Sequence, residues 1–165
     1  MTALITIRNA ALLIALGALA TIGGAWFIEI VLGVKPCPLC LEQRIPYYAG
    51  IPVALLSAAL ADRAPQAARA LLALTALIFL IASGMGAYHA GVEFGWWKGP
   101  ADCTGTVPTA ASMGDFLKSL DTVRVIRCDE VAMRIFGLSL AAWNAVIAGA
   151  IAAYAAFATL TQRST

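Results

Sequence analysis

Four cysteines are the residues of this chain whose type and spacing are best suited to chemistry. They form two pairs, the closely spaced Cys37-Pro38-Leu39-Cys40 and the widely separated Cys103 and Cys128, and all four lie outside the long apolar runs. Two residues between cysteines permit a small disulfide ring, and two dithiols on the same aqueous side of a membrane can pass a disulfide between them. The pattern therefore predicts electron transfer by thiol chemistry.

An arginine close to the first pair strengthens this prediction. Arg44 follows Cys40 by four residues, so in a helix the guanidinium would lie one turn away on the same face. Pro36 and Pro38 keep the preceding chain extended, and we therefore expect Cys40 near a helix N-terminus. The helix dipole and the arginine would lower the pKa of Cys40 and stabilise an anion formed beside it. The alternative is that Arg44 only extends its charge to the membrane interface.

The single histidine, His89, stands in the segment Tyr88-His89-Ala90-Gly91-Val92-Glu93. It is either an interfacial residue without a chemical role or, close to Cys40 and Arg44, a donor of a hydrogen bond or a proton to a reduced carrier in the lipid. The sequence leaves both possibilities open.

Two other uses of the cysteines compete with redox chemistry. A zinc site would need four converging thiolates, but 24 residues separate Cys103 from Cys128 instead of about two to four, and we expect no metal. Structural disulfides are common outside the cytosol and would explain the pair in the long loop. They explain poorly a closely spaced pair beside Arg44.

The composition places these residues in an integral membrane protein. Of the 165 residues, 61% are hydrophobic and only 12% are charged, which is unlike a soluble domain. Uncharged runs long enough for about 30 Å of hydrocarbon must be helical, because lipid satisfies no backbone hydrogen bond. We predict one all-α domain, residues 1–165, built as a bundle of four transmembrane helices. The spans are expected at about 10–28, 45–61, 70–90 and 137–160, with outer loops at about 29–44 and 91–136.

Alternatives exist for the first span and for the long loop. The first run could be a cleaved signal peptide, but it continues through Trp26 and Phe27 beyond the usual length of about 7 to 15 residues. In the long loop, apolar residues recur at helical spacing from Met113 to Leu120. This stretch predicts a short amphipathic helix, which lies either on the membrane surface or on the ends of the spans.

The position of the cysteines also predicts the orientation of the chain. Four spans put both termini on one side, and all four cysteines fall on the other side. Disulfides persist in the periplasm or outside the cell and not in the cytosol. We therefore expect cytoplasmic termini and periplasmic cysteines.

Electrons taken from thiols need an acceptor. The chain has no haem-attachment motif, flavin fingerprint or nucleotide-binding loop, and nothing in it indicates a nucleic-acid partner. A lipid-soluble acceptor remains, and a quinone fits because it is flat, dissolves in the bilayer and accepts two electrons with two protons. Cys40, Arg44 and His89 are the residues expected near such a ring.

The ordered set of motifs resembles the DsbB family of disulfide bond formation proteins, bacterial inner-membrane thiol:quinone oxidoreductases. The resemblance covers nearly the whole chain. It rests on Cys37-Pro38-Leu39-Cys40 with Glu42-Gln43-Arg44, on Tyr88 to Glu93 with Trp97 before Cys103, on Cys128, and on Gly137-Leu138-Ser139-Leu140 with Trp143-Asn144. It implies a multi-pass protein of the inner membrane with a bound quinone, ubiquinone or menaquinone. It also implies a soluble periplasmic partner with a thioredoxin fold, of the DsbA type.

The resemblance further implies a role for each site residue. Cys103 would form the mixed disulfide with the partner and Cys128 would be its mate in the loop. Cys37 would exchange with the loop pair, and Cys40 would contact the quinone, with Arg44 and His89 stabilising its reduced form. Two alternatives stay open: a specialised paralogue that serves a dedicated thiol partner, and a disulfide-stapled structural membrane protein without turnover.

Overall fold

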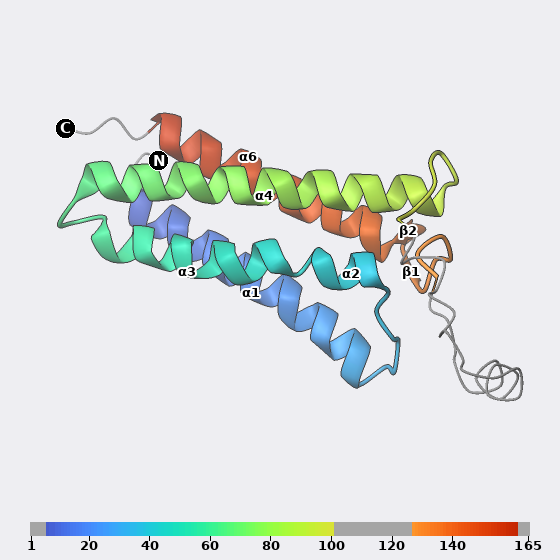
Figure 1. The fold of residues 1–165 in the computed structure, drawn as a ribbon. Coiled ribbons are helices and arrows are strands. Elements are labelled where there is room, and N and C mark those ends of the chain that lie inside the picture. The colour runs from blue at the N-terminus through green and yellow to red at the C-terminus, as the bar shows by residue number, and fades with distance from the viewer. Residues whose placement is uncertain (1–5, 101–126, 162–165) are drawn as a thin grey trace, which may run out of the picture.

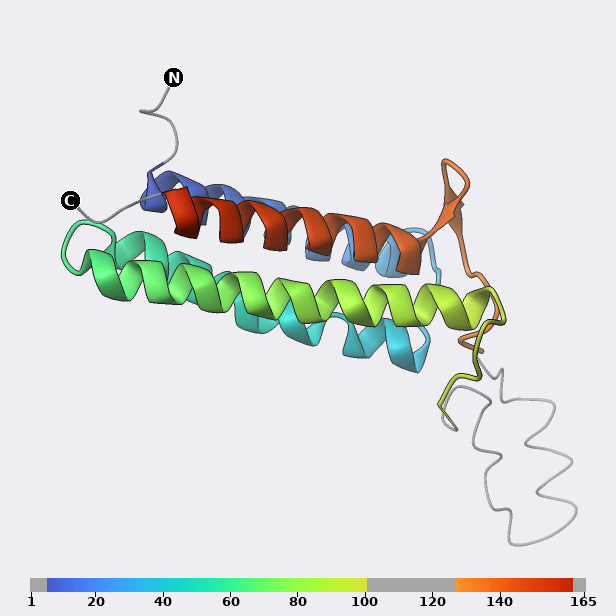
Figure 2. The same cartoon turned by 90° about the horizontal axis from the view of Figure 1, so that it is seen from above.

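The computed structural model describes residues 6–100 and 127–161. Cys103 and the amphipathic helix predicted between Met113 and Leu120 lie outside the described residues. Four long helices pack side by side (Figures 1 and 2). They are α1 (Ile7–Ile30), α3 (Ile45–Leu60), α4 (Pro65–Glu93) and α6 (Leu140–Thr161), and a short helix α2 (Pro38–Glu42) precedes α3.

Three of these helices are long and apolar enough to cross a membrane, namely α1, α4 and α6, with 24, 29 and 22 residues. The prediction of a largely helical membrane protein is confirmed to this extent. Helix α3 has 16 residues, or about 24 Å at 1.5 Å per residue, and falls short of a standard span. The count of four spans therefore stays a prediction.

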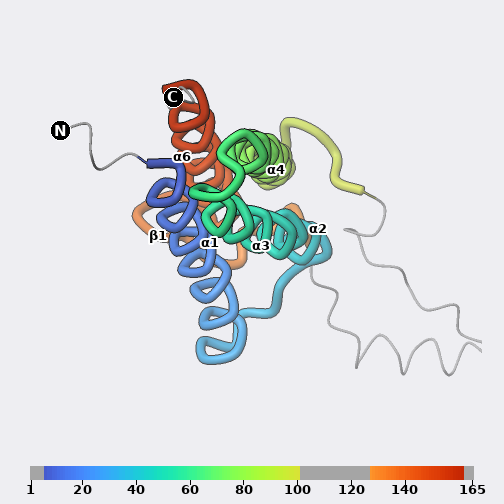
Figure 3. Tube along the Cα trace, turned by 90° about the vertical axis from the view of Figure 1, so that its left-hand side faces the viewer, coloured from blue at the N-terminus to red at the C-terminus, as the bar shows by residue number. Residues whose placement is uncertain are grey.

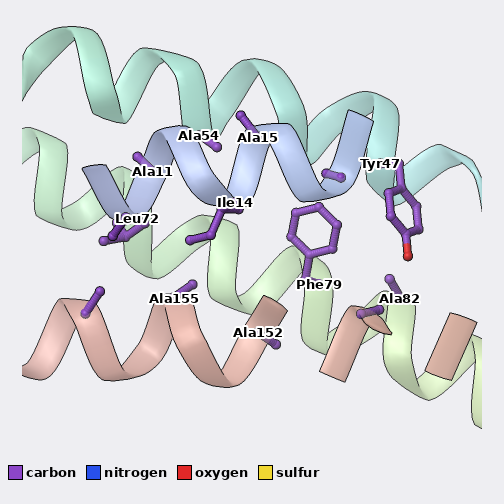
Figure 4. Close-up of a cluster of buried hydrophobic side chains, with 14 of the residues drawn as sticks. Ala11, Ile14, Ala15, Tyr47, Ala54, Leu72, Phe79, Ala82, Ala152 and Ala155 are labelled. Carbon is purple, nitrogen blue, oxygen red and sulfur yellow. The ribbon is translucent and has the colours of Figure 1, made fainter. Parts of the chain in front are cut away.

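Small side chains let the helices approach closely. Helix α4 packs against α3 and α6, and α1 packs against α3 and α6 on the other side (Figure 3). The core is largely alanine, with a few larger side chains (Figure 4). The largest fully buried one is Phe79, whose ring meets the ring of Tyr47 edge-on at a centroid distance of 5.2 Å. Such alanine-rich interfaces are typical of helices that associate in lipid, where the hydrophobic effect does not favour association and close packing does.

The closest approach between α4 and α6 predicts a strong effect of one methyl group. A Cβ atom at Gly86 would lie 2.6 Å from the backbone nitrogen of Ala145, which cannot move without shifting α6. We expect Gly86→Ala to destabilise the protein by about 1 to 3 kcal/mol, measured by thermal unfolding in detergent. Gly84→Ala, in the same helix, is the matched control, because a Cβ there meets nothing within 4 Å. Equal stability of the two variants would contradict this packing.

The two ends of the bundle differ in character. One end of the bundle holds the start of α1, the end of α6 and the turn between α3 and α4 (Figure 1). There Arg8 Nη1 donates to Asp62 Oδ2 at 2.7 Å. The opposite end holds α2 and a hairpin of β1 (Arg134–Ile135) and β2 (Leu138–Ser139) (Figure 1). The cysteine-bearing segments described by the structure are thus gathered at one end.

The hairpin was not predicted from the sequence. Its strands pair antiparallel, and the turn residues Phe136 and Gly137 have φ angles of 49° and 85°. Positive φ at both central residues is typical of the tight turns that join twisted strands. Ser139 then begins α6 as a cap, since its Oγ accepts from the backbone nitrogen of Ala142 at 3.2 Å. Helix α6 starts at Leu140, after this turn.

Candidate functional site

The first cysteine pair lies on a helix of its own. Cys37 is the N-cap of α2, and its Sγ accepts from the backbone nitrogen of Cys40 at 3.3 Å. Pro38 occupies the first turn, where its missing N–H costs nothing. The two sulfur atoms are 2.7 Å apart. Cys40 lies in the first turn of α2, so the expectation of a helix N-terminus near it is confirmed, but this helix is short: α2 ends at Glu42, and the long helix α3 starts at Ile45.

This geometry makes Cys37 the acidic thiol of the pair. The hydrogen bond from the Cys40 thiol lowers the pKa of Cys37 to about 5, and His89 adds to the effect against the cost of burial. The same hydrogen bond, together with burial, raises the pKa of Cys40. The sequence-based expectation of a lowered pKa at Cys40 is therefore corrected: the lowered pKa lies at Cys37, whose sulfur also accepts from the backbone nitrogen of Cys40 and lies 3.7 Å from His89 Nε2.

A pH profile of alkylation tests this assignment in the reduced protein. Because the thiolate is the reactive form, the alkylation rate of Cys37 should stay level above about pH 6 and fall as the pH drops through about 5. Tandem mass spectrometry separates labels on Cys37 from labels on Cys40. In Cys40→Ala the largest stabilising contact is lost, so the midpoint should rise. Preferential labelling of Cys40 in the wild type would refute the assignment.

His89 lies between the first pair and the second. Its side chain is buried, with Nε2 at 3.7 Å from Cys37 Sγ and 3.3 Å from the carbonyl oxygen of Cys128. Its Nδ1 lies 2.7 Å from Nε2 of Gln43. The structure thus brings His89 to the cysteines, and its role in the reaction stays a prediction.

Cys128 packs directly against the first pair. It is fully buried in a cluster with Cys37, Leu39 and Val92, against which Cys40 also packs. Cys128 is disulfide-bonded, whereas Cys37 and Cys40 are free. One cysteine of the long loop is therefore already within the site, which the sequence alone did not establish.

Arg44 is held in place by an acid that the sequence analysis did not single out. Its Nη1 donates to Glu29 Oε2 on α1 at 2.6 Å, and its side chain is only 13% exposed. Arg44 is the residue that precedes the first turn of α3, at the break after α2, and its side chain makes no capping hydrogen bond. An arginine that merely reached for solvent would not be buried and paired in this way, so its charge is available inside the bundle.

Two cavities meet at Cys40. The first, about 340 Å³, is largely apolar and lies between the second half of α1, the α2–α3 junction and the start of α6; Cys40, Arg44 and His89 line it. The second, about 300 Å³, is more polar, and Cys37, Cys40 and His89 line it. Cys40 therefore faces both cavities, whereas Cys37 faces only the second and Arg44 only the first.

Sequence reasoning missed a set of polar residues behind the cysteines. Gln43 contacts His89 and accepts from Asn144 Nδ2 at 2.6 Å, and Asn144 Oδ1 accepts from the Tyr47 hydroxyl at 2.7 Å. Gln43 and Asn144 belong to the motifs quoted above, but their types alone indicated no role. The signal that could have identified them is that polar residues next to apolar runs are costly in lipid unless they have partners.

The same thiols and imidazole also have the donor types of a metal site. Among the residues that the structure describes, Cys37, Cys40 and His89 are the group whose ligand atoms converge, all within 4.8 Å of one another. Three such donors suit a soft or borderline cation. The prediction that no metal is required stays a prediction.

Comparison with known proteins identifies the chain's relatives. A family model described as disulfide bond formation protein DsbB matches residues 7–158. Disulfide bond formation protein B of Saccharophagus degradans is 31% identical over 151 residues, covering 88% of each chain. Disulfide bond formation protein B 1 of Pseudomonas aeruginosa is 30% identical over 144 residues, covering 83% of this chain and 85% of the relative. No solved structure matches.

These matches confirm the resemblance drawn from the motifs. The family model spans both cysteine segments of the chain and nearly all of the three apolar helices that can cross a membrane. With a cysteine pair, a histidine and a paired arginine gathered at one end of the bundle, the chain belongs to the DsbB family of membrane proteins for disulfide bond formation.

Proposed function

We propose that this protein is a thiol:quinone oxidoreductase, which re-oxidises a periplasmic dithiol protein of the DsbA type and passes the electrons to a membrane quinone. The observation that carries the proposal is the position of Cys40 between two cavities of different character. A dithiol with both cysteines in the second cavity and only Cys40 in the first can exchange disulfides on one side and deliver electrons on the other.

The residues that line the first cavity suit a quinone. The walls of this cavity are mostly apolar, with the aromatic residues Tyr47 and Trp143 among them, and it lies between helices, as is common for sites that bind small apolar molecules. Its polar groups include the guanidinium of Arg44 and the sulfur of Cys40. When bound, a quinone accepts two electrons and two protons. Arg44 would attract the negative charge that develops on its oxygens.

The chain's own residues would handle the thiol steps. By family resemblance, the partner dithiol reduces a disulfide between Cys103 and Cys128, and the loop thiols then reduce the disulfide between Cys37 and Cys40. Attack on Cys37 is supported by its place in the second cavity beside Cys128. When the bond between Cys37 and Cys40 forms again, two electrons and two protons leave the pair through the Cys40 side.

The same arrangement supports a proposal about the location of the protein. We propose a four-span protein of the bacterial inner membrane, with α3 as the fourth span, cytoplasmic chain ends and periplasmic cysteines. Support comes from the separation of the two ends of the bundle. The Arg8–Asp62 pair lies with the α3–α4 turn, and α2 lies at the far end with the hairpin (Figure 1).

Anaerobic mixing tests the proposal directly. The oxidised protein in detergent is mixed with a reduced thioredoxin-fold dithiol protein and a soluble ubiquinone or menaquinone analogue, while quinone absorbance is recorded. One quinone reduced per partner dithiol oxidised is the expected result. If neither analogue is reduced while all disulfides persist, the structural alternative without turnover replaces this function. A partner that is oxidised only when it is one dedicated protein would indicate the specialised paralogue.

A further inference from the structure

A chain of hydrogen bonds behind the cysteines has only one consistent direction. Gln43 Nε2 lies 3.1 Å from the carbonyl oxygen of Leu39, which can only accept, so this atom of Gln43 is the amide nitrogen. The Oε1 atom on the other side accepts from Asn144 Nδ2 at 2.6 Å. Asn144 Oδ1 in turn accepts from the Tyr47 hydroxyl at 2.7 Å. The orientation of both amides is thereby determined without reference to the histidine.

This direction settles which nitrogen of His89 carries the proton. The amide nitrogen of Gln43 lies 2.7 Å from Nδ1, and because it is a donor, Nδ1 must accept. The imidazole proton is therefore on Nε2. That nitrogen faces two acceptors, Cys37 Sγ at 3.7 Å and the carbonyl oxygen of Cys128 at 3.3 Å. In this series of hydrogen bonds, which runs from the Tyr47 hydroxyl through Asn144 and Gln43 to His89, every donor then faces an acceptor.

We infer that Gln43, oriented by Asn144 and Tyr47, is a positioning residue that holds His89 in the Nε2–H tautomer, with its N–H directed at Cys37 and Cys128. The inference rests on the proposed function and adds a role for residues outside the cysteines. His89 acts as a fixed hydrogen-bond donor to the sulfur that exchanges with the loop pair. It does not relay protons, because the Gln43 amide blocks the addition of a proton at Nδ1.

Because Gln43 and His89 are buried, a mismatch in their hydrogen bonds would cost free energy. Gln43 and His89 are both almost fully buried, at 7% and 2% exposure. In such surroundings a donor that faces another donor is costly, because neither group can turn to water instead. The wrong tautomer of His89 would also direct a lone pair at the Cys37 thiolate. The amide of Gln43 therefore decides between an attractive and a repulsive contact at the reacting sulfur.

Nuclear magnetic resonance can read the tautomer directly, because His89 is the single histidine of the chain. The reduced protein is labelled with ¹⁵N-histidine, and two-bond ¹H–¹⁵N correlations distinguish a protonated from an unprotonated ring nitrogen. In the wild type we expect a proton on Nε2 and none on Nδ1. In Gln43→Glu, a carboxylate replaces the amide donor and should draw a proton to Nδ1. A protonated Nδ1 in the wild type, or an unchanged pattern in Gln43→Glu, would overturn the inference.

Cys37 provides a second readout that a purely structural role would not move. In Gln43→Leu the donor to Nδ1 is lost, so the Nε2–H tautomer is no longer enforced. Near the midpoint of its pH profile, the alkylation rate of Cys37 should fall by about twofold to fivefold, which corresponds to a rise of about one-half to one unit in the pKa of Cys37. Tyr47→Phe, which removes only the last link, should give a smaller change. An unchanged rate in Gln43→Leu would also count against the inference.

The control removes a buried hydrogen bond far from the site. Ser57 is fully buried, and its Oγ donates to the Ala68 carbonyl at 2.7 Å, close to the α3–α4 turn. Ser57→Ala should leave the tautomer and the Cys37 rate unchanged. These readouts need no quinone and no partner. Absence of quinone reduction therefore refutes the proposed function alone, whereas turnover with an unchanged tautomer in Gln43→Glu refutes the inference alone.

Discussion

Replacing Cys40 by serine is expected to lower quinone reduction by roughly a thousandfold or more. Cys40 is the sulfur that lines both cavities, and a hydroxyl cannot form the disulfide whose formation releases two electrons. Quinone absorbance under anaerobic conditions, with a reduced DsbA-type dithiol as donor, is the measurement. A variant that retains even a tenth of wild-type turnover would remove Cys40 from the electron path.

Cys37→Ser is the informative comparison for this variant. It should also stop turnover, since the disulfide again cannot form. However, Cys37 does not line the first cavity, so quinone binding should be unchanged when it is replaced. Binding can be followed separately by the amount of quinone that co-purifies. Loss of bound quinone in Cys37→Ser would contradict the placement of the quinone in the first cavity.

The second large effect is expected at Arg44. In Arg44→Gln, kcat/KM for quinone should fall by about 10² to 10³, the usual cost of removing a donor that stabilises developing negative charge. The loss should appear with quinone as the varied substrate and not with the dithiol partner. Steady-state kinetics with each substrate varied in turn makes this distinction.

Two further variants test whether the effect depends on the positive charge of Arg44 itself or on how Glu29 positions it. Glu29→Gln keeps Arg44 but removes the oxygen charge that it contacts at 2.6 Å, and we expect a smaller loss, of about tenfold or less. Arg8→Gln breaks the pair with Asp62 at the other end of the bundle, where both side chains are exposed, and should leave kinetics unchanged. An Arg44→Gln enzyme with wild-type kcat/KM for quinone would contradict the assigned cavity.

Residue types and spacing singled out several side chains that the structure brings together, and the roles of these side chains stay predictions. Cys37, Cys40, Arg44 and His89 lie together, and Cys128 packs against them. The reason is that placing polar or ionisable side chains at the ends of apolar runs costs free energy. Such residues, here thiols, one histidine and an arginine, are therefore expected to have a function. The long apolar helices were predictable for a similar reason, since lipid leaves the backbone no other partner.

The acidic thiol could not be predicted from spacing. A continuous helix through Cys40 would have placed its sulfur over Arg44, but the chain breaks between Glu42 and Ile45, and Cys37 becomes the cap of α2. Which sulfur donates and which accepts depends on this break and on the imidazole of His89. Those are contacts between segments far apart in sequence, and no local pattern encodes them.

The hairpin and the amide chain were missed for different reasons. Two strands of two residues each are too short to show an alternating pattern, and the turn uses Phe136 at a φ of 49°, which few side chains adopt. Gln43 and Asn144 are 101 positions apart, so only the packing of α6 against the α2–α3 junction brings them together. A single sequence carries no signal for such a pair.

The shortness of α3 has a consequence for the bilayer itself. With 16 residues, α3 covers about 24 Å, whereas a typical hydrocarbon layer is about 30 Å thick. If α3 is a span, local thinning of the bilayer would relieve this hydrophobic mismatch and would bring α2 and its cysteines to a level that acyl chains and water both reach. Lipids with longer acyl chains would increase the mismatch and hinder the water-borne partner more than the lipid-borne acceptor. The choice of lipid should thus change which half of the reaction limits the rate.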